Sequence, residues 1–100
     1  MVWYAIIGQD VPNSLPLRQQ NRAAHLERIQ ILADEGRVLV AGPFPAVDND
    51  DPGPAGFTGS LMIVDFPDQA AAQTWADADP YVTGGVFSGI EVRPFKPVLP

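Results

Sequence analysis

Apolar residues recur along the chain with the two-residue period of strands and the longer period of helices, in the order β-α-β-β-α-β. Residues 2–7 carry apolar side chains at both alternating positions, which is typical of a strand buried on both faces, and Gly8 is expected to end it. Residues 37–41, 59–66 and 90–95 have the same strand character.

The longer period predicts two helices. The first is expected to begin after the candidate cap Ser14 and to run to Glu35, because Gly36 suits the position that follows a helix. The second is expected to run from Asp68, its N-cap, to about residue 78. The apolar arc of the first helix contains Leu17, Ala24, Leu26, Ile29, Ile31, Leu32 and Ala33.

Turns and loops connect these elements. Asp79-Pro80 is expected to start a short helical turn, which Gly84-Gly85 closes. The second strand is expected to end in the turn Gly42-Pro43-Phe44-Pro45. Residues 46–56 are acidic and rich in proline and glycine, so we expect a mobile surface loop that tolerates shortening.

This order of elements predicts one α+β domain over residues 1–100, a ferredoxin-like βαββαβ sandwich with an antiparallel sheet. Such a sheet normally has one polar, solvated face. Residues 2–7 and 61–66 are instead apolar on both faces, so something must cover the second face. A homodimer packed sheet against sheet is the economical expectation, and a different partner on that face is the alternative.

Composition narrows the classes of function. A net charge of −6 with only six Lys and Arg argues against nucleic acid as a partner. The lack of cysteine excludes disulfides and cysteine nucleophiles and fits a cytoplasmic protein. No apolar stretch approaches the roughly 18 residues of a membrane span, and the N-terminus lacks the basic start of a signal peptide, so no membrane partner is expected.

The chain has no phosphate-binding loop, no glycine-rich dinucleotide motif and no His/Cys set, so neither cofactor nor metal is expected. Asp48, Asp50 and Asp51 lack the glycine and terminal glutamate of a calcium loop, and a solvated loop is the better interpretation.

The only histidine is the first candidate for chemistry. His25 lies near the middle of the apolar arc, so it is either a packed core residue or a functional one. Arg22 lies one turn before it and Arg28 about one turn after it, and cations beside a core-facing histidine pack poorly. Ser60 on the third strand and Asp79 are its candidate neighbours.

Asp79 has two interpretations that can both hold. It caps the helical turn that Pro80 starts, and its carboxylate can also orient His25 as half of a general acid/base pair. Gly42-Pro43 is either a plain turn or backbone that approaches a ligand. Three aromatic residues belong either to the core or to a pocket wall: Trp3, Tyr4 and Tyr81.

Several short motifs in this order resemble the YciI-like (YCII-related) family. They are Arg22-Ala23-Ala24-His25-Leu26, Gly36, Ala41-Gly42-Pro43, Gly59-Ser60 and Asp79-Pro80-Tyr81. The resemblance implies pairing of two chains into a dimeric α/β barrel, a functional His25–Asp79 pair, and a pocket that includes Arg22, Pro43 and Ser60. It also suggests an enzyme, since one such protein removes chloride from a hydroxylated aromatic ring.

The resulting hypothesis is acid/base chemistry on a small organic molecule, possibly cyclic or aromatic. His25 moves the proton, Asp79 fixes its tautomer, and Arg22 holds an oxyanion or carboxylate, with Tyr81 as a further pocket residue. The hypothesis requires His25 and Asp79 within hydrogen-bond reach, about 2.6–3.2 Å. The alternative is a non-catalytic ligand-binding or accessory domain with a vestigial pair.

Overall fold

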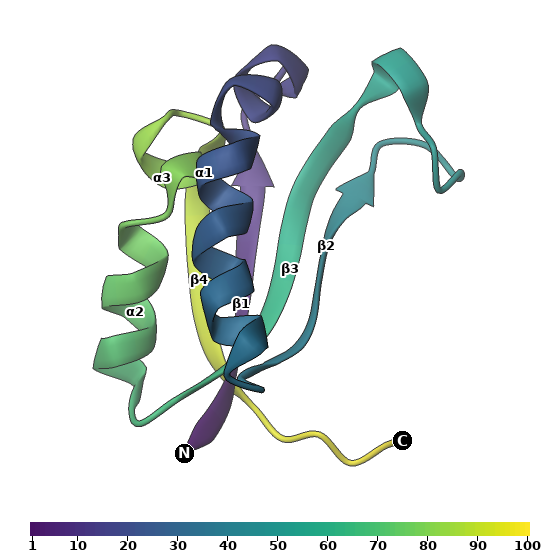
Figure 1. Cartoon of the computed structure of the whole chain (residues 1–100). Coiled ribbons are helices and arrows are strands. Elements are labelled where there is room, and N and C mark those ends of the chain that lie inside the picture. Colours follow the sequence, from purple (N-terminus) through teal and green to yellow (C-terminus); the bar gives the residue numbers. More distant parts are fainter.

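Four strands form one antiparallel sheet in the computed structural model, which describes all residues from 1 to 100 (Figure 1). They are β1 (Val2–Asp10), β2 (Val38–Pro45), β3 (Phe57–Phe66) and β4 (Phe87–Phe95). Their order across the sheet is β2-β3-β1-β4, so the first and third strands lie in the middle. The chain therefore has the ferredoxin-like α+β fold that its sequence predicts.

Three helices lie on one side of this sheet (Figure 1). They are α1 (Leu15–Asp34), α2 (Gln69–Asp77) and the single turn α3 (Pro80–Thr83), and a 3₁₀ turn, η1 (Gly53–Ala55), lies in the loop between β2 and β3. None of the helices is both long enough and apolar enough to cross a membrane.

Side-chain caps fix where the two later helices begin. Asp68 accepts a hydrogen bond from the amide of Ala71, and Asp79 accepts one from the amide of Tyr81, as the sequence predicts. Ser14 stands at the N-cap of α1 but makes no side-chain cap, so that expectation was wrong. Its hydroxyl donates instead to the carboxylate of Asp10 at the end of β1.

Two strand ends differ from the sequence prediction. Residues 42–45 continue β2 instead of forming a turn, with Pro43 opposite Ser60 of β3. Proline is tolerated there because β2 is an edge strand, where a missing N–H need not break the ladder. β1 likewise continues past Gly8, whose lack of a side chain makes room for the ring of Phe87.

The face that α1 buries is narrower than its apolar arc. The buried positions are Arg18, His25, Ile29 and Leu32. Leu26 and Ile31 are 42% and 57% exposed, so their predicted burial was wrong. The C-terminal half of α1 covers the core with Ile29 and Leu32, while its N-terminal half buries the charged Arg18.

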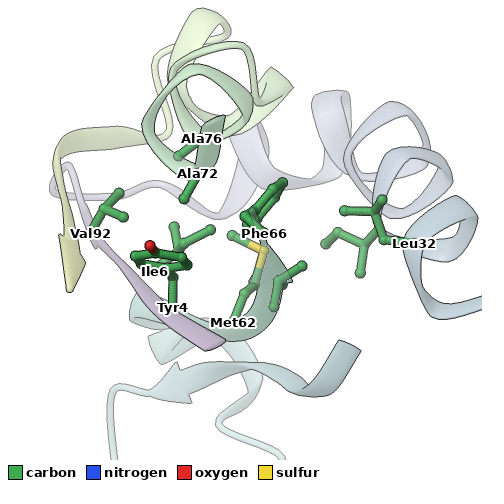
Figure 2. Packing of buried hydrophobic residues seen from close by; sticks show 10 residues of the cluster. Tyr4, Ile6, Leu32, Met62, Phe66, Ala72, Ala76 and Val92 are labelled. Carbon is green, nitrogen blue, oxygen red and sulfur yellow. The ribbon is translucent and has the colours of Figure 1, made fainter. Parts of the chain in front are cut away.

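The hydrophobic core fills the layer between the helices and the sheet. Figure 2 shows Ala72 and Ala76 of α2 pointing toward Tyr4 and Ile6 of β1, and these small side chains let the helix approach the strand closely. The other buried members are Ile29, Leu32, Met62, Val64, Phe66 and Val92. Full burial of a side chain such as Ile6 contributes about 1.5–3 kcal/mol.

The opposite face of the sheet has no helix over it. The side chains of Trp3, Ala5 and Ile7 alternate with the core residues of β1, as the sequence predicts, but within one chain they are only half-buried. Ile63 pairs with Ala5 across this face, and the exposed Val40 pairs with Ile63. A continuous apolar surface, centred on β1 and β3, is therefore left uncovered within one chain.

Candidate active site

His25 and Asp79 meet where α1 passes the first turn of α3. The Nδ1 atom of His25 lies 2.7 Å from Oδ1 of Asp79, and both side chains are buried. The same Oδ1 accepts the amide N–H of Tyr81 at 2.8 Å. Asp79 therefore caps α3 and contacts His25 at once, and the predicted distance is confirmed, while the role of the two residues as a general acid/base pair stays a prediction.

An aromatic ring also stacks on the face of the imidazole of His25. The ring of Tyr81 stacks on that of His25 with centroids 3.8 Å apart and planes 5° apart. The stacked ring of Tyr81 fixes the plane of the imidazole. The hydrogen bond to Asp79 fixes the rotation of the imidazole within that plane. Nδ1 is thereby occupied, while Nε2 has no hydrogen-bond partner in the chain.

A cavity of about 490 Å³ opens beside His25, between α1 and the β2–β3 pair. All four candidate substrate-binding residues line it, and they are Arg22, Pro43, Ser60 and Tyr81. Asp79 lies behind His25 and does not line the cavity. In Figure 1, β2 and β3 lean away from the N-terminal half of α1.

Half of the residues lining this cavity are hydrophobic. Leu15 and Ile29 contribute from α1, and Phe57 and Met62 from β3. A mostly apolar wall with a few polar groups is typical of sites for small organic molecules. No group of three His, Asp or Glu side chains is placed so that it could hold a metal ion.

Arg18 and Asp10 form a buried ion pair at the end of the cavity that sequence reasoning missed. Nε of Arg18 donates to one oxygen of Asp10 at 2.6 Å and Nη2 to the other at 2.9 Å. Nη2 also donates to the Gly59 carbonyl and to Oγ of Ser60, each at 2.9 Å. The Ser14 hydroxyl donates to Asp10 at 2.5 Å and completes the network.

The sequence held a partial signal for this pair. Arg18 stands two helical turns before His25 and so shares its face of α1, which marks it as a second charged residue on a buried stripe. Asp10 gave no such signal, because its place beside Arg18 depends on β1 running on past Gly8.

The other sequence candidates lie in different environments. Arg22 is exposed at the cavity wall and makes no ion pair. Arg28 turns to α2, where it donates to the Trp75 carbonyl at 2.9 Å and lies 4.6 Å from the centre of its ring. Tyr4 belongs to the core and Trp3 to the uncovered sheet face, so neither is a pocket wall.

Burial raises the pKa of the Tyr81 phenol above its ordinary value of 10.0. The positive charges of Arg18 and Arg22 oppose this rise but do not cancel it. The phenol is therefore neutral at pH 7 and points to the backbone carbonyl of Arg18, 3.4 Å away. Tyr81 thus offers the site a neutral ring rather than a phenolate.

Comparison with known proteins places the chain in a family. The model of the YCII-related domain matches residues 2–96. Protein YciI of Escherichia coli O6:H1 is 58% identical over 96 residues, which is 96% of this chain and 98% of that protein. An uncharacterized protein of Haemophilus influenzae is 47% identical over 98 residues, covering 98% of this chain and 100% of its own length. The chain belongs to the YCII-related family.

A solved structure resembles the whole fold. It is 5-chloro-2-hydroxyhydroquinone dehydrochlorinase (TftG) from Burkholderia phenoliruptrix AC1100, in complex with 2,5-dihydroxybenzoquinone. The two chains are 26% identical with a TM-score of 0.81, over 94% of this chain and 93% of the other. The resemblance to this family noted in the sequence is therefore confirmed.

Proposed function

We propose that this protein is an enzyme that moves protons on a small hydroxylated ring compound, with His25 as general acid/base and Asp79 as its orienting partner. One observation carries the proposal: Nδ1 of His25 is held 2.7 Å from a buried carboxylate, while the ring lines a cavity of about 490 Å³. Such a pair leaves one ring nitrogen free to exchange a proton with a bound molecule.

Each side chain has a defined role in this proposal. Asp79 accepts the N–H of Nδ1, so the lone pair of the neutral imidazole is on Nε2. When Nε2 takes a proton, the carboxylate stabilises the imidazolium. Arg22, at the cavity wall and without an ion-pair partner, neutralises the negative charge that builds on a ring oxygen.

The cavity and the solved relative support the proposed substrate class. An apolar wall with polar groups suits a flat ring that carries oxygens, and that relative is a dehydrochlorinase in complex with a dihydroxybenzoquinone. Loss of HCl from a chlorinated trihydroxybenzene removes two hydroxyl protons, places one on the carbon that bore chlorine and releases chloride with the bonding electron pair. The product is a hydroxyquinone, and the net change is proton transfer and elimination without an external oxidant.

Chloride release from 5-chloro-2-hydroxyhydroquinone tests this proposal. The wild-type protein is expected to release chloride faster than buffer, and His25→Ala to reduce the rate by about 100- to 10,000-fold. Gln20→Ala, on the exposed side of α1, is the matched control and keeps the rate. Binding of the quinone without chloride release by the wild type would instead favour the non-catalytic ligand-binding alternative.

We also propose that two chains pair through the uncovered sheet face. Trp3, Ala5 and Ile7 of β1 are only half-buried on the face away from the helices, and Val40 of β2 is 51% exposed there, so apolar side chains on this face are left uncovered by the chain itself. Isologous pairing of this face would remove it from water on both chains at once. Light scattering is expected to give about twice 10.8 kDa, and a mass of one chain at micromolar concentration would overturn the dimer.

A further inference from the structure

The wall of the cavity contains a guanidinium, that of Arg18 on α1, with an unused N–H group. Arg18 is 6% exposed and lines the cavity. Its Nε and Nη2 atoms bond Asp10, Gly59 and Ser60, but Nη1 has no partner in the chain and is not sealed from the cavity. Because the rest of the guanidinium is fully bonded, this accessible N–H group is a donor that a ligand oxygen in the cavity can use.

Ser60 presents a second donor beside it. The side chain is 4% exposed, lines the cavity and accepts a hydrogen bond from Nη2 of Arg18 at 2.9 Å. Because that bond uses a lone pair of Oγ, the hydroxyl hydrogen must point elsewhere, and no acceptor for it lies within the chain. The positive charge of Arg18 polarises this hydroxyl and makes it a stronger donor.

Both donors are held rigidly before any ligand arrives. Both carboxylate oxygens of Asp10 accept hydrogen bonds from Arg18, and the side chain of Asp10 is only 1% exposed. The rings of Phe57 and Tyr81 lie with their centres 5.1 Å from the guanidinium carbon. A donor pair that needs no rearrangement on binding is the arrangement that stabilises charge at an oxygen most effectively.

We propose that Nη1 of Arg18 and Oγ of Ser60 form a preformed subsite for one oxygen of the ligand, either a ring carbonyl or a deprotonated ring hydroxyl. Asp10 is the positioning residue of this subsite. Because Asp10 already neutralises Arg18, the subsite contributes hydrogen bonds rather than net charge, and the net positive charge of the cavity comes from Arg22. The proposal rests on the proposed function for the nature of the ligand and assigns a direct contact that the His25–Asp79 pair does not make.

Calorimetric titration with 2,5-dihydroxybenzoquinone tests the subsite. Ser60→Ala is expected to weaken binding about tenfold, the effect of losing one hydrogen bond to a charged or polarised oxygen. Ser88→Ala removes an exposed hydroxyl from β4, away from the cavity, and is expected to leave affinity unchanged. Equal affinity of wild type and Ser60→Ala, or no binding by the wild type at millimolar quinone, would overturn the subsite.

A double-mutant cycle tests whether Arg18 orients Ser60. Lysine can still pair with Asp10 but cannot also reach Ser60 in the fork geometry of arginine. In Arg18→Lys protein the further change Ser60→Ala is therefore expected to cost less than threefold, whereas additive losses would overturn the coupling. If Arg18→Lys does not fold, Ser60→Ala against Ser88→Ala still decides whether the subsite exists.

The two proposals fail in different ways. His25→Ala is expected to bind the quinone within threefold of wild type, because the subsite is intact, while it loses chloride release. Tight binding that depends on Ser60, in a protein that releases no chloride, would overturn the proposed function and keep the subsite. Chloride release that depends on His25, with Ser60→Ala binding and turning over like wild type, would overturn the subsite alone.

Discussion

A single carboxylate oxygen connects backbone structure with chemistry at the residue scale. Oδ1 of Asp79 caps α3 through the Tyr81 amide and holds Nδ1 of His25, so the start of a helix and the orientation of the imidazole depend on one atom. The sequence revealed this pair because the chain has one histidine and Asp-Pro is a recognisable helix start. The Arg18–Asp10 pair stayed hidden because it depends on where β1 ends, which the apolar pattern placed two residues too early.

Asp79→Asn separates the capping of α3 by this residue from its effect on the charge of His25. Asparagine caps helices about as well as aspartate, so the free energy of unfolding is expected to change by less than about 1 kcal/mol. The charge that stabilises the imidazolium is lost, so chloride release is expected to fall at least about 100-fold. Urea denaturation and kcat measured on the same preparations check this, and a variant that unfolds readily yet keeps its rate would show that Asp79 serves only as a cap.

Tyr81 gives the fold a pH dependence on the alkaline side. Its folded pKa is raised above the ordinary value of 10.0 by burial, so the folded protein holds the phenolic proton more tightly than the unfolded chain does. This contribution to stability is complete below the unfolded pKa and is lost as pH rises through the folded pKa. Tyr81→Phe keeps the ring that stacks on His25 and removes the proton.

The free energy of unfolding of wild type is therefore expected to fall more steeply than that of Tyr81→Phe above about pH 10. Urea denaturation at a series of pH values from neutral to alkaline measures the two slopes. Parallel slopes would show that another group causes the alkaline loss.

The sequence pattern located best those strands and helices that have strong local signals. The order of the strands and helices followed from apolar alternation and from caps such as Asp68, which are local signals. The edge strand β2 was cut short because its glycine and prolines look like a turn, although an edge position accepts them. The predicted buried face of α1 was too broad, because Leu26 lines the cavity and Ile31 is exposed, and no local signal separates either from the core residues Ile29 and Leu32.

Gly8 is where the extension of β1 toward the site can be tested. A Cβ at this position would meet the ring of Phe87 at 2.5 Å, so Gly8→Ala must displace that ring from its contact with the strand. The loss expected from overpacking is about 1–3 kcal/mol of unfolding free energy. Gly89→Ala on β4 meets no atom within 4 Å and is the matched control. Equal stability of the two variants by urea denaturation would contradict the close packing of β1 on Phe87.

At the scale of the whole molecule, the two faces of the sheet differ in what covers them. One face supports the helices, the core and the cavity, and its buried polar residues are confined to the end where β1, β3 and α1 meet. The other face has hydrophobic residues but no covering element, although the chain carries a net charge of −6 that keeps other surfaces hydrated. An apolar sheet face is energetically favourable only if another surface removes it from water.

Ile7→Lys tests the whole-molecule arrangement without touching the site. Ile7 lies on the uncovered face between Leu61 and Glu91, so in a single chain a lysine can extend into water, beside a carboxylate. In the proposed dimer the same ammonium would be shut between two sheets, and burying a charge costs several kcal/mol. We expect monomers by light scattering with the circular dichroism of a folded chain, while Gln30→Lys on the exposed side of α1 stays dimeric. A dimeric Ile7→Lys protein would mean that the chains pair through a different surface.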